Sequence, residues 1–344
     1  MQGSSLLKRG DRVITRRRII IALGAGALAA LLAAAAVVNS LAQDYPTKPV
    51  VIVVPFAPGG PTDTLARNLG VAMGAALKQQ IIIDSSGGAG GTIGINKVAK
   101  ARPDGYTILL MHIGISTAPA LYRNLPYDTL NDVEPIGRVA DVPMTLIAKK
   151  TLPPNNFREF LAYAKANKDK LTYGNAGLGS SSHLCGLLFM STIETAFTTV
   201  PYKGNAPAMI DLVGGQIGFM CDQTTNTTQQ INAGTIKAYG VTSKTRVPSL
   251  PDIPTLNEAG LTGFEVVIWY GLYAPKGTPK LILDKLVAAL QSAVNDTTFK
   301  SRLAELGAEP VPVSKATPES LRTFLKSEIE RWGPIIKKAG VYAD

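Results

Sequence analysis

The stretch VVIVVPFAPGGPTDTLARNLG, residues 50–70, indicates the fold class. Its short apolar run predicts a buried strand, and Gly59 and Gly60 then permit a tight turn. After Thr62 and Asp63, apolar residues recur every four positions, which predicts a helix with one buried face. A glycine turn between a strand and a helix can bind an anion on main-chain amides. A tight turn without a ligand is the alternative that this motif alone leaves open.

Short apolar runs alternate with helical periodicities along most of the chain, which indicates an α/β fold with parallel-rich sheets flanked by helices. The runs RVADVPMTLIAKK and EVVIWYGLYAPKG read as strands that pass from one domain to the other, which makes them the two crossover strands of a hinge. We therefore expect a discontinuous first domain, residues 43–142 plus 267–344, and a second domain, residues 143–266.

The first 42 residues have the features of a cleavable signal peptide. Six Lys or Arg residues precede the apolar run 19–38, and Ser40-Leu41-Ala42 predicts cleavage before Gln43. An uncleaved membrane anchor is the alternative, since 20 apolar residues can span a bilayer. The segment TRRRII loosely fits a twin-arginine signal, so the choice between the Sec and Tat routes stays open.

Charge and cysteine content limit the possible partners. The leader carries six basic residues and one Asp, so its removal lowers the net charge from +10 to +5, spread without a basic tract. This charge suits anionic ligands and does not suggest nucleic acid.

Cys185 and Cys221 both fall in apolar segments, and we expect two buried free thiols, with a disulfide as the alternative.

The glycine-rich turn GGAGGTIG, residues 87–94, does not fit a nucleotide site. Ile93 stands where a dinucleotide fingerprint needs its third glycine, and no Gly-Lys-Ser/Thr follows as in a P-loop. We therefore expect a loop and helix start here, and no cofactor.

A third turn, GNAGLGSSSHLCG, offers hydroxyl groups at another expected helix start. A serine hydrolase using Ser181 with His183 is one alternative, but no serine here has glycines two residues before and two after it. His112 and His183 are the only histidines, and neither has a metal-ligand spacing, so no metal site is expected.

Polar residues also follow several predicted strands. Thr117, Tyr202 and Lys203 do so, as do Asp222 and Gln223. In open α/β sheets, ligands bind at the carboxyl ends of strands, where all of these residues are expected.

Together these motifs resemble the substrate-binding proteins of tripartite tricarboxylate transporters, the Bug or TctC-like family. The matching segments run in family order over residues 44–340 and include YPTKPVVIVVPFAPGGPTDTLAR, GAGGTIG, ARPDGYTILL, LPYDTLNDVEPI, GNAGLGSSSHL, VPYKGNAPAMIDLVGGQIGFMCDQ, GTIKAYGVTS and LPDIPTLNEAGLTGFEVVIWYGLYAPKGTP. One departure is Cys221, which stands before Asp222 where family members often have an aromatic or aliphatic residue.

The resemblance implies a two-domain, type II periplasmic-binding-protein fold that closes on its ligand. It implies that the first and third turns clasp one carboxylate and that Tyr202 and Asp222 line the variable end of the cleft. We expect Asp63 to cap the following helix, because its carboxylate would repel that of a ligand. Carried over to this sequence, the expected ligand-binding residues are Phe56, Pro58, Gly59, Gly60, Thr62, Asp63, Thr117, Ser180, Ser181, Ser182, His183, Tyr202 and Asp222.

The implied function is that of a non-catalytic, monomeric periplasmic receptor. It would capture a small di-, tri- or aromatic carboxylate and deliver it to the membrane permease of a tripartite transporter. A ligand-loaded sensor for a membrane signalling protein is an alternative, as is the secreted hydrolase. Ligand identity is not encoded in any motif.

Overall fold

The computed structural model describes residues 45–340, 342 and 343. The expected signal peptide and its cleavage site lie in residues 1–44, outside the described residues. Lys48–Asp344 group as one unit, apart from Met1–Thr47, and the description below concerns this larger unit.

One mixed sheet runs through the unit. Its strand order is β2 (Ile81–Ser85), β1 (Val50–Val54), β3 (Thr107–His112), β9 (Val267–Pro275), β4 (Val133–Lys149), β7 (Phe219–Gln223), β5 (Thr172–Asn175) and β6 (Thr198–Pro201). Strands β8 (Ile236–Val241) and β10 (Glu309–Pro310) each pair with β4. The pairs β1–β2, β1–β3, β5–β6 and β5–β7 are parallel, whereas β4 and β9 are antiparallel to their neighbours.

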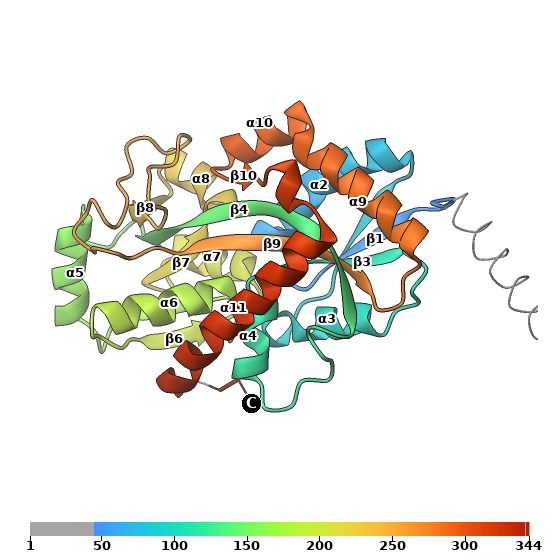
Figure 1. Cartoon of the computed structure of the whole chain (residues 1–344). Helices are drawn as coiled ribbons and strands as arrows, with labels where there is room; N and C mark the ends of the chain where they lie inside the picture. Colours follow the sequence, from blue (N-terminus) through green and yellow to red (C-terminus); the bar gives the residue numbers. More distant parts are fainter. Residues whose placement is uncertain (1–44, 341, 344) are drawn as a thin grey trace, which may run out of the picture. The chain divides into compact units, whose positions relative to one another are not determined.

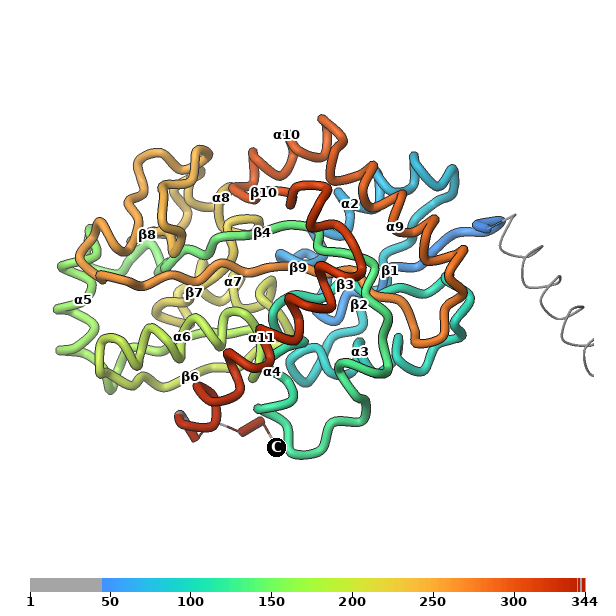
Figure 2. The backbone as a smooth tube through the Cα atoms, in the orientation of Figure 1, coloured from blue at the N-terminus to red at the C-terminus, as the bar shows by residue number. Residues whose placement is uncertain are grey.

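Strand β4 divides the sheet into two parts. Its residues 133–143 pair with β9, and its residues 144–149 pair with β7 and β8. We call β1, β2, β3, β9, β10 and the first part of β4, with their helices, the first section. The second section comprises β5 to β8, the last part of β4, and their helices. Figures 1 and 2 show β4, in green, and β9, in orange, running side by side between the two sections.

Helices cover both sections. The first section carries α2 (Pro61–Leu77), α3 (Thr92–Ala99), α4 (Gly114–Leu121), α9 (Lys280–Asn295), α10 (Thr297–Glu305) and α11 (Pro318–Ala339), with short 3₁₀ turns at Ala89–Gly91 and Val313–Lys315. The second carries α5 (Phe157–Ala166), α6 (Ser181–Thr192), α7 (Asn205–Val213) and α8 (Thr224–Asn232). Helix α2 packs on α9, and α4 packs on α11.

Local sequence explains where many helices start. Helix α11 begins at Pro318, whose missing amide hydrogen costs nothing at the first helical position, and Thr317 caps it by accepting a hydrogen bond from the Ser320 amide. Asp296 caps α10 in the same way through the Phe299 amide. These caps satisfy amides that the helices themselves leave without acceptors.

The cysteine prediction was wrong. Cys185, on the first turns of α6, and Cys221, in β7, form a disulfide with a Cα–Cα distance of 6.1 Å. Both side chains are buried, as expected, but α6 packs directly on β7 and so brings two segments 36 residues apart within bonding range. The sequence spacing carried no information about this packing.

The predicted fold class is confirmed by this mixed sheet with flanking helices. Among the described residues, no helix is both long enough and apolar enough to cross a membrane.

Candidate functional site

A small cavity lies where the two sections meet. Its volume is about 10 Å³, and it is lined by Phe56, Gly60, Pro61, Thr62, His112, Ala176, Ser181, Asn205 and Gln223. We call it the inner cavity. The first five residues belong to the first section and the last four to the second, and no Lys or Arg is among them.

Four helices begin at the inner cavity. Gly60 precedes α2, Ser181 and Asn205 are the first residues of α6 and α7, and Gln223 precedes α8. The first amides of a helix have no acceptor within it, and the aligned peptide dipoles place about half a positive charge at its start. The inner cavity is therefore electropositive without containing a formal cation.

The first glycine turn is braced by Asp63. The Gly59 amide donates to Asp63 Oδ2 at 3.0 Å, and Arg67 binds the same carboxylate through Nε at 2.8 Å and Nη2 at 3.1 Å. Asp63 lies in the first turn of α2 and accepts from the amide of Gly59, the residue before the N-cap Gly60. The arrangement is similar to a capping box. The Gly59 amide is occupied by Asp63, which differs from the expectation that it faces a ligand.

A chain of hydrogen bonds connects the two sections beside the cavity. The Tyr270 hydroxyl lies 3.1 Å from Thr62 Oγ1 and donates to Gln223 Oε1 at 2.8 Å. Gln223 Nε2 in turn donates to Ser181 Oγ at 3.1 Å. All four side chains are buried. Because Ser181 Oγ accepts in this chain, its own hydrogen is left to donate into the cavity.

The three serines of the third turn have different roles. Ser180 caps α6 by accepting from the His183 amide at 3.2 Å. Ser182 accepts from the Ala176 amide at 2.8 Å and donates to Asn205 Oδ1 at 3.0 Å. Of the three, Ser181 alone lines the inner cavity. The other two hold the turn and the start of α6 in place.

Both histidines are neutral acceptors. His183 Nδ1 accepts from the Gly179 amide at 3.2 Å, and burial lowers the pKa of His183 to about 4. His112 Nδ1 accepts from the Gly114 amide at 2.9 Å, and burial lowers the pKa of His112 to about 3. The His112 ring stacks on Phe56 at a centroid distance of 4.8 Å. Within the described part of the chain, His183 makes no hydrogen bond with Ser181.

Asp222 is a buried acid one residue behind the cavity. It accepts hydrogen bonds from the Asn205 side chain, from the Asn226 side chain at 2.5 Å and from the Gln223 amide at 2.7 Å. Burial is the largest influence and raises the pKa of Asp222 to about 7, although these donors oppose the rise. Because Asn205 lines the inner cavity and donates a hydrogen bond to Asp222, the charge of the Asp222 carboxylate lies close to the cavity wall.

A second, outer cavity of about 230 Å³ adjoins the first and shares Phe56 and Ala176 with it. Tyr202 lines the outer cavity, but its hydroxyl donates to Asp211 at 2.6 Å. Desolvation, followed by this bond to Asp211, raises the pKa of Tyr202 to about 12. Pro58 is exposed and lines neither cavity, whereas Thr117 is buried in α4 and donates to the Gly114 carbonyl oxygen.

Some residues of the site were missed from the sequence: Pro61, Ala176 and Asn205 line the inner cavity, and Tyr270 lies beside it. Asn205 follows Gly204 at a helix start, a pattern that could have drawn attention to it. Tyr270 carries no such signal, because its position depends on how β9 packs against the second section. Gln223 was noted as a residue at a strand end but was not among the expected ligand-binding residues.

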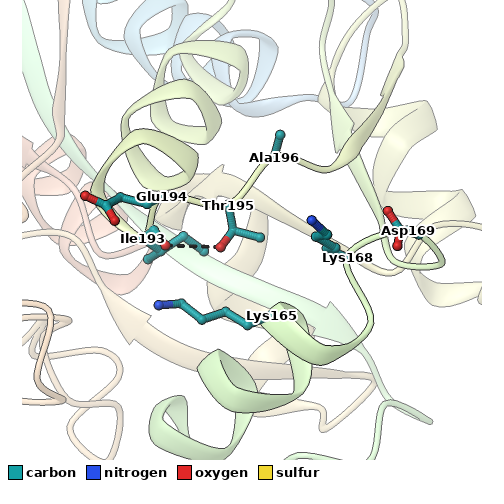
Figure 3. A pocket seen from close by; sticks show the side chains of 7 residues that line it. All are labelled: Lys165, Lys168, Asp169, Ile193, Glu194, Thr195 and Ala196. Carbon is teal, nitrogen blue, oxygen red and sulfur yellow. Dashed lines mark hydrogen bonds between the residues drawn. The ribbon is translucent and has the colours of Figure 1, made fainter.

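A larger hollow elsewhere does not resemble a binding site. It measures about 450 Å³ and is lined by Lys165, Lys168, Asp169, Ile193, Glu194, Thr195 and Ala196 (Figure 3). Its charged side chains are exposed, and Thr195 Oγ1 donates to the Ile193 carbonyl oxygen of its own turn. Exposed charges of both signs give little selectivity for a ligand.

Comparison with known proteins identifies the family. The profile of the tripartite tricarboxylate transporter family receptor, TctC, matches residues 65–341. The chain belongs to this receptor family. The UPF0065 protein in the TAR-I ttuE-ttuC' intergenic region of Agrobacterium vitis is 48% identical to this chain over 87% of each chain.

Solved structures agree with this family. The periplasmic binding protein BugD is 53% identical to this chain and has a TM-score of 0.84. The alignment covers 87% of this chain and 99% of BugD. MatC from Rhodopseudomonas palustris, solved with bound malate, is 40% identical with a TM-score of 0.81, covering 85% of this chain and 100% of that one. The family expected from the motifs is confirmed, and the TctC family is one of solute-binding receptors.

Proposed function

We propose that this TctC-family chain is a receptor that binds one carboxylate group of a small organic acid in the inner cavity. The observation that carries the proposal is the convergence of four helix starts on a cavity without Lys or Arg. Amide and hydroxyl donors satisfy a carboxylate's acceptor sites through directed hydrogen bonds. Binding of malate by MatC supports an acid of this class.

Specific donors follow from the hydrogen-bond pattern. The hydroxyl of Ser181, the second amide hydrogen of Gln223 and the main-chain amides at the starts of α2 and α6 are the groups that we assign to the carboxylate. Ser180, Ser182 and Asp63 hold these donors in position. Tyr202 and Phe56 line the outer cavity, so we assign them to the rest of the ligand.

The size of the inner cavity implies movement. About 10 Å³ accommodates roughly one water molecule, which is much less than malate requires. We propose that residues 143–266 move as one lobe against residues 43–142 and 267–344, with the two strand crossings near Pro143 and Val267 as the hinge. Opening then admits the ligand, and closure shields it from water.

The cellular role follows from the family. Membership of a periplasmic receptor family implies a periplasmic location, and we propose that the loaded receptor delivers its ligand to the permease of a tripartite transporter.

A ligand panel tests the binding proposal. We would measure the melting temperature of the mature protein with malate, succinate, citrate and benzoate, and with malamide as an uncharged control. A ligand at about 100 times its Kd stabilises the fold by about 2.7 kcal/mol. We expect at least one acid, and not malamide, to raise the melting temperature, and the rise to shrink in Ser181→Ala. The absence of any shift across the panel would contradict carboxylate binding.

A further inference from the structure

Of the three glycine-rich turns, GGAGGTIG is the one that does not line the inner cavity. We propose that Gly90 of this turn, together with Tyr122, forms a closing contact with Leu178 and Gly179 of the second section. We call these four residues the seam. This inference rests on the proposed function, because it makes Gly90 and Tyr122 positioning residues for ligand capture, which act through the contact between the two sections.

Gly90 and Leu178 are too close for any larger side chain. A Cβ atom on Gly90 would overlap the carbonyl oxygen of Leu178 and lie 2.8 Å from the Tyr122 hydroxyl oxygen. Gly90 also has a φ of +60°, in the left-handed region that favours glycine. At this point the first section therefore contacts the second through its main chain, with no side chain between them.

A directional bond reinforces the close approach. The Tyr122 hydroxyl, at the end of α4, donates to the Leu178 carbonyl oxygen at 3.2 Å. A Cβ atom on Gly179 would lie 3.1 Å from the Leu121 side chain, so the second section also lacks a side chain where the two meet. Glycines on both sides permit a main-chain contact that side chains would prevent.

The seam borders the ligand site. Gly90, Tyr122 and Leu178 all line the outer cavity, which shares Phe56 and Ala176 with the inner one. When the sections separate, the outer cavity widens and the seam breaks. A ligand in the inner cavity can then leave only after the Tyr122–Leu178 bond and the Gly90 contact are lost.

This arrangement gives the seam a thermodynamic role. The apparent affinity of a receptor decreases when a smaller fraction of its molecules can adopt the closed, binding-competent form. A bond that exists only in the closed form raises that fraction and slows dissociation. Through this equilibrium the seam raises the affinity for every ligand alike.

Three variants separate this role from general destabilisation. Gly90→Ala places a methyl group against Leu178, and Tyr122→Phe removes only the hydroxyl. The matched control is Gly277→Ala, because Gly277 also has a positive φ, +81°, lies in the first section, and has open space around its missing Cβ. Gly277→Ala thus carries the backbone strain of a left-handed alanine but makes no contact with the second section.

We would titrate malate, or the best acid of the panel, by calorimetry and follow release by stopped flow. Gly90→Ala should weaken binding more than tenfold relative to Gly277→Ala. Tyr122→Phe should weaken it about threefold to tenfold, mainly through faster dissociation, a loss that corresponds to one ordinary hydrogen bond. Equal affinity in Gly90→Ala and Gly277→Ala would overturn the inference.

Small-angle X-ray scattering gives an answer that needs no ligand. Gly90→Ala should have a larger radius of gyration than both the unchanged protein and Gly277→Ala, because the added methyl group keeps the sections apart. Identical radii would contradict the seam. If the unchanged protein bound no acid at all, the proposed function would fail, and scattering would still decide the inference about Gly90.

Discussion

The hydroxyl of Tyr270 in β9 lies 2.8 Å from Gln223 Oε1 at the start of α8, so a strand of the first section is hydrogen-bonded to a cavity residue of the second. Tyr270 is fully buried, which leaves Gln223 no water to replace this donor. The pair therefore helps to hold the two sections together in the closed form.

Tyr270→Phe should lower the free energy of unfolding by about 1–3 kcal/mol, since it leaves a buried acceptor unpaired. Tyr273→Phe is the matched control, because the Tyr273 hydroxyl in the same strand is buried and has no hydrogen-bond partner among the described residues. Its removal should be neutral or stabilising. Urea unfolding of both variants checks the difference, and equal losses would show that the Tyr270–Gln223 bond contributes nothing specific.

Ser181→Ala and Ser180→Ala should differ in their effect on affinity. Ser181→Ala should weaken binding of the acid by roughly 1–3 kcal/mol, because a charged acceptor loses a donor, and it should also lower the free energy of unfolding, because the buried Gln223 Nε2 loses its acceptor. Ser180→Ala removes the cap of α6 and should lower the free energy of unfolding by about 1 kcal/mol. Calorimetric titration and urea unfolding on each variant separate the two. Unchanged affinity in Ser181→Ala would place the carboxylate elsewhere.

Affinity for the acid should increase as the pH falls from 8 to 6. The pKa of Asp222 is raised to about 7, so Asp222 becomes neutral in this range and repels a bound anion less. The two histidines do not titrate there, because burial lowers their pKa values to about 4 and about 3. Asp222→Asn should give a nearly flat affinity profile. A profile that is equally steep with and without Asp222 would rule out this coupling.

His112 should make the fold less stable in acid. Its pKa is about 3 in the folded protein and about 6.5 in the unfolded chain, so only the unfolded chain takes up the proton between these values. Stability therefore falls as the pH drops from 6.5, by about 1.4 kcal/mol per unit for this group. In His112→Asn, whose Oδ1 can replace Nδ1 as acceptor for the Gly114 amide, the decline between pH 6.5 and 5 should be about 2 kcal/mol smaller. Denaturant unfolding at several pH values measures it, and parallel curves would contradict the assignment.

The disulfide between Cys185 and Cys221 should stabilise the fold by about 3–4 kcal/mol, from the loop entropy that it removes from the unfolded chain. Urea unfolding with and without a reductant provides the measurement. The double variant Cys185→Ala, Cys221→Ala serves as the control, since a reductant should not affect it. An identical midpoint for the oxidised and reduced protein would contradict the prediction.

Local patterns allowed much of the fold to be predicted from the sequence. The first glycine turn and the serine turn are strand–turn–helix units whose periodicity and caps lie within about 20 residues, so Thr62 and Ser181 could be placed at helix starts. Strand β4 could be recognised as a long apolar run that crosses between the two sections.

Other site features depend on packing between distant segments. Tyr270 reaches Gln223 only because of the register of β9 against β4, and Cys185 meets Cys221 only because α6 lies on β7. Helix α8 was unexpected for a similar reason. Its sequence, TTNTTQQIN, lacks apolar periodicity, yet Thr224 and Thr228 are buried and donate to carbonyl oxygens of Gly307 and Leu306.

The central claim, that helix starts and Ser181 bind a carboxylate, is tested most directly by a crystal structure of the mature protein grown with malate or the best acid of the panel. We predict one carboxylate in the inner cavity, with its oxygens about 3 Å from Ser181 Oγ and from the Thr62 amide nitrogen. A well-ordered acid bound outside this cavity, with Ser181 still hydrogen-bonded only to Gln223, would contradict the account.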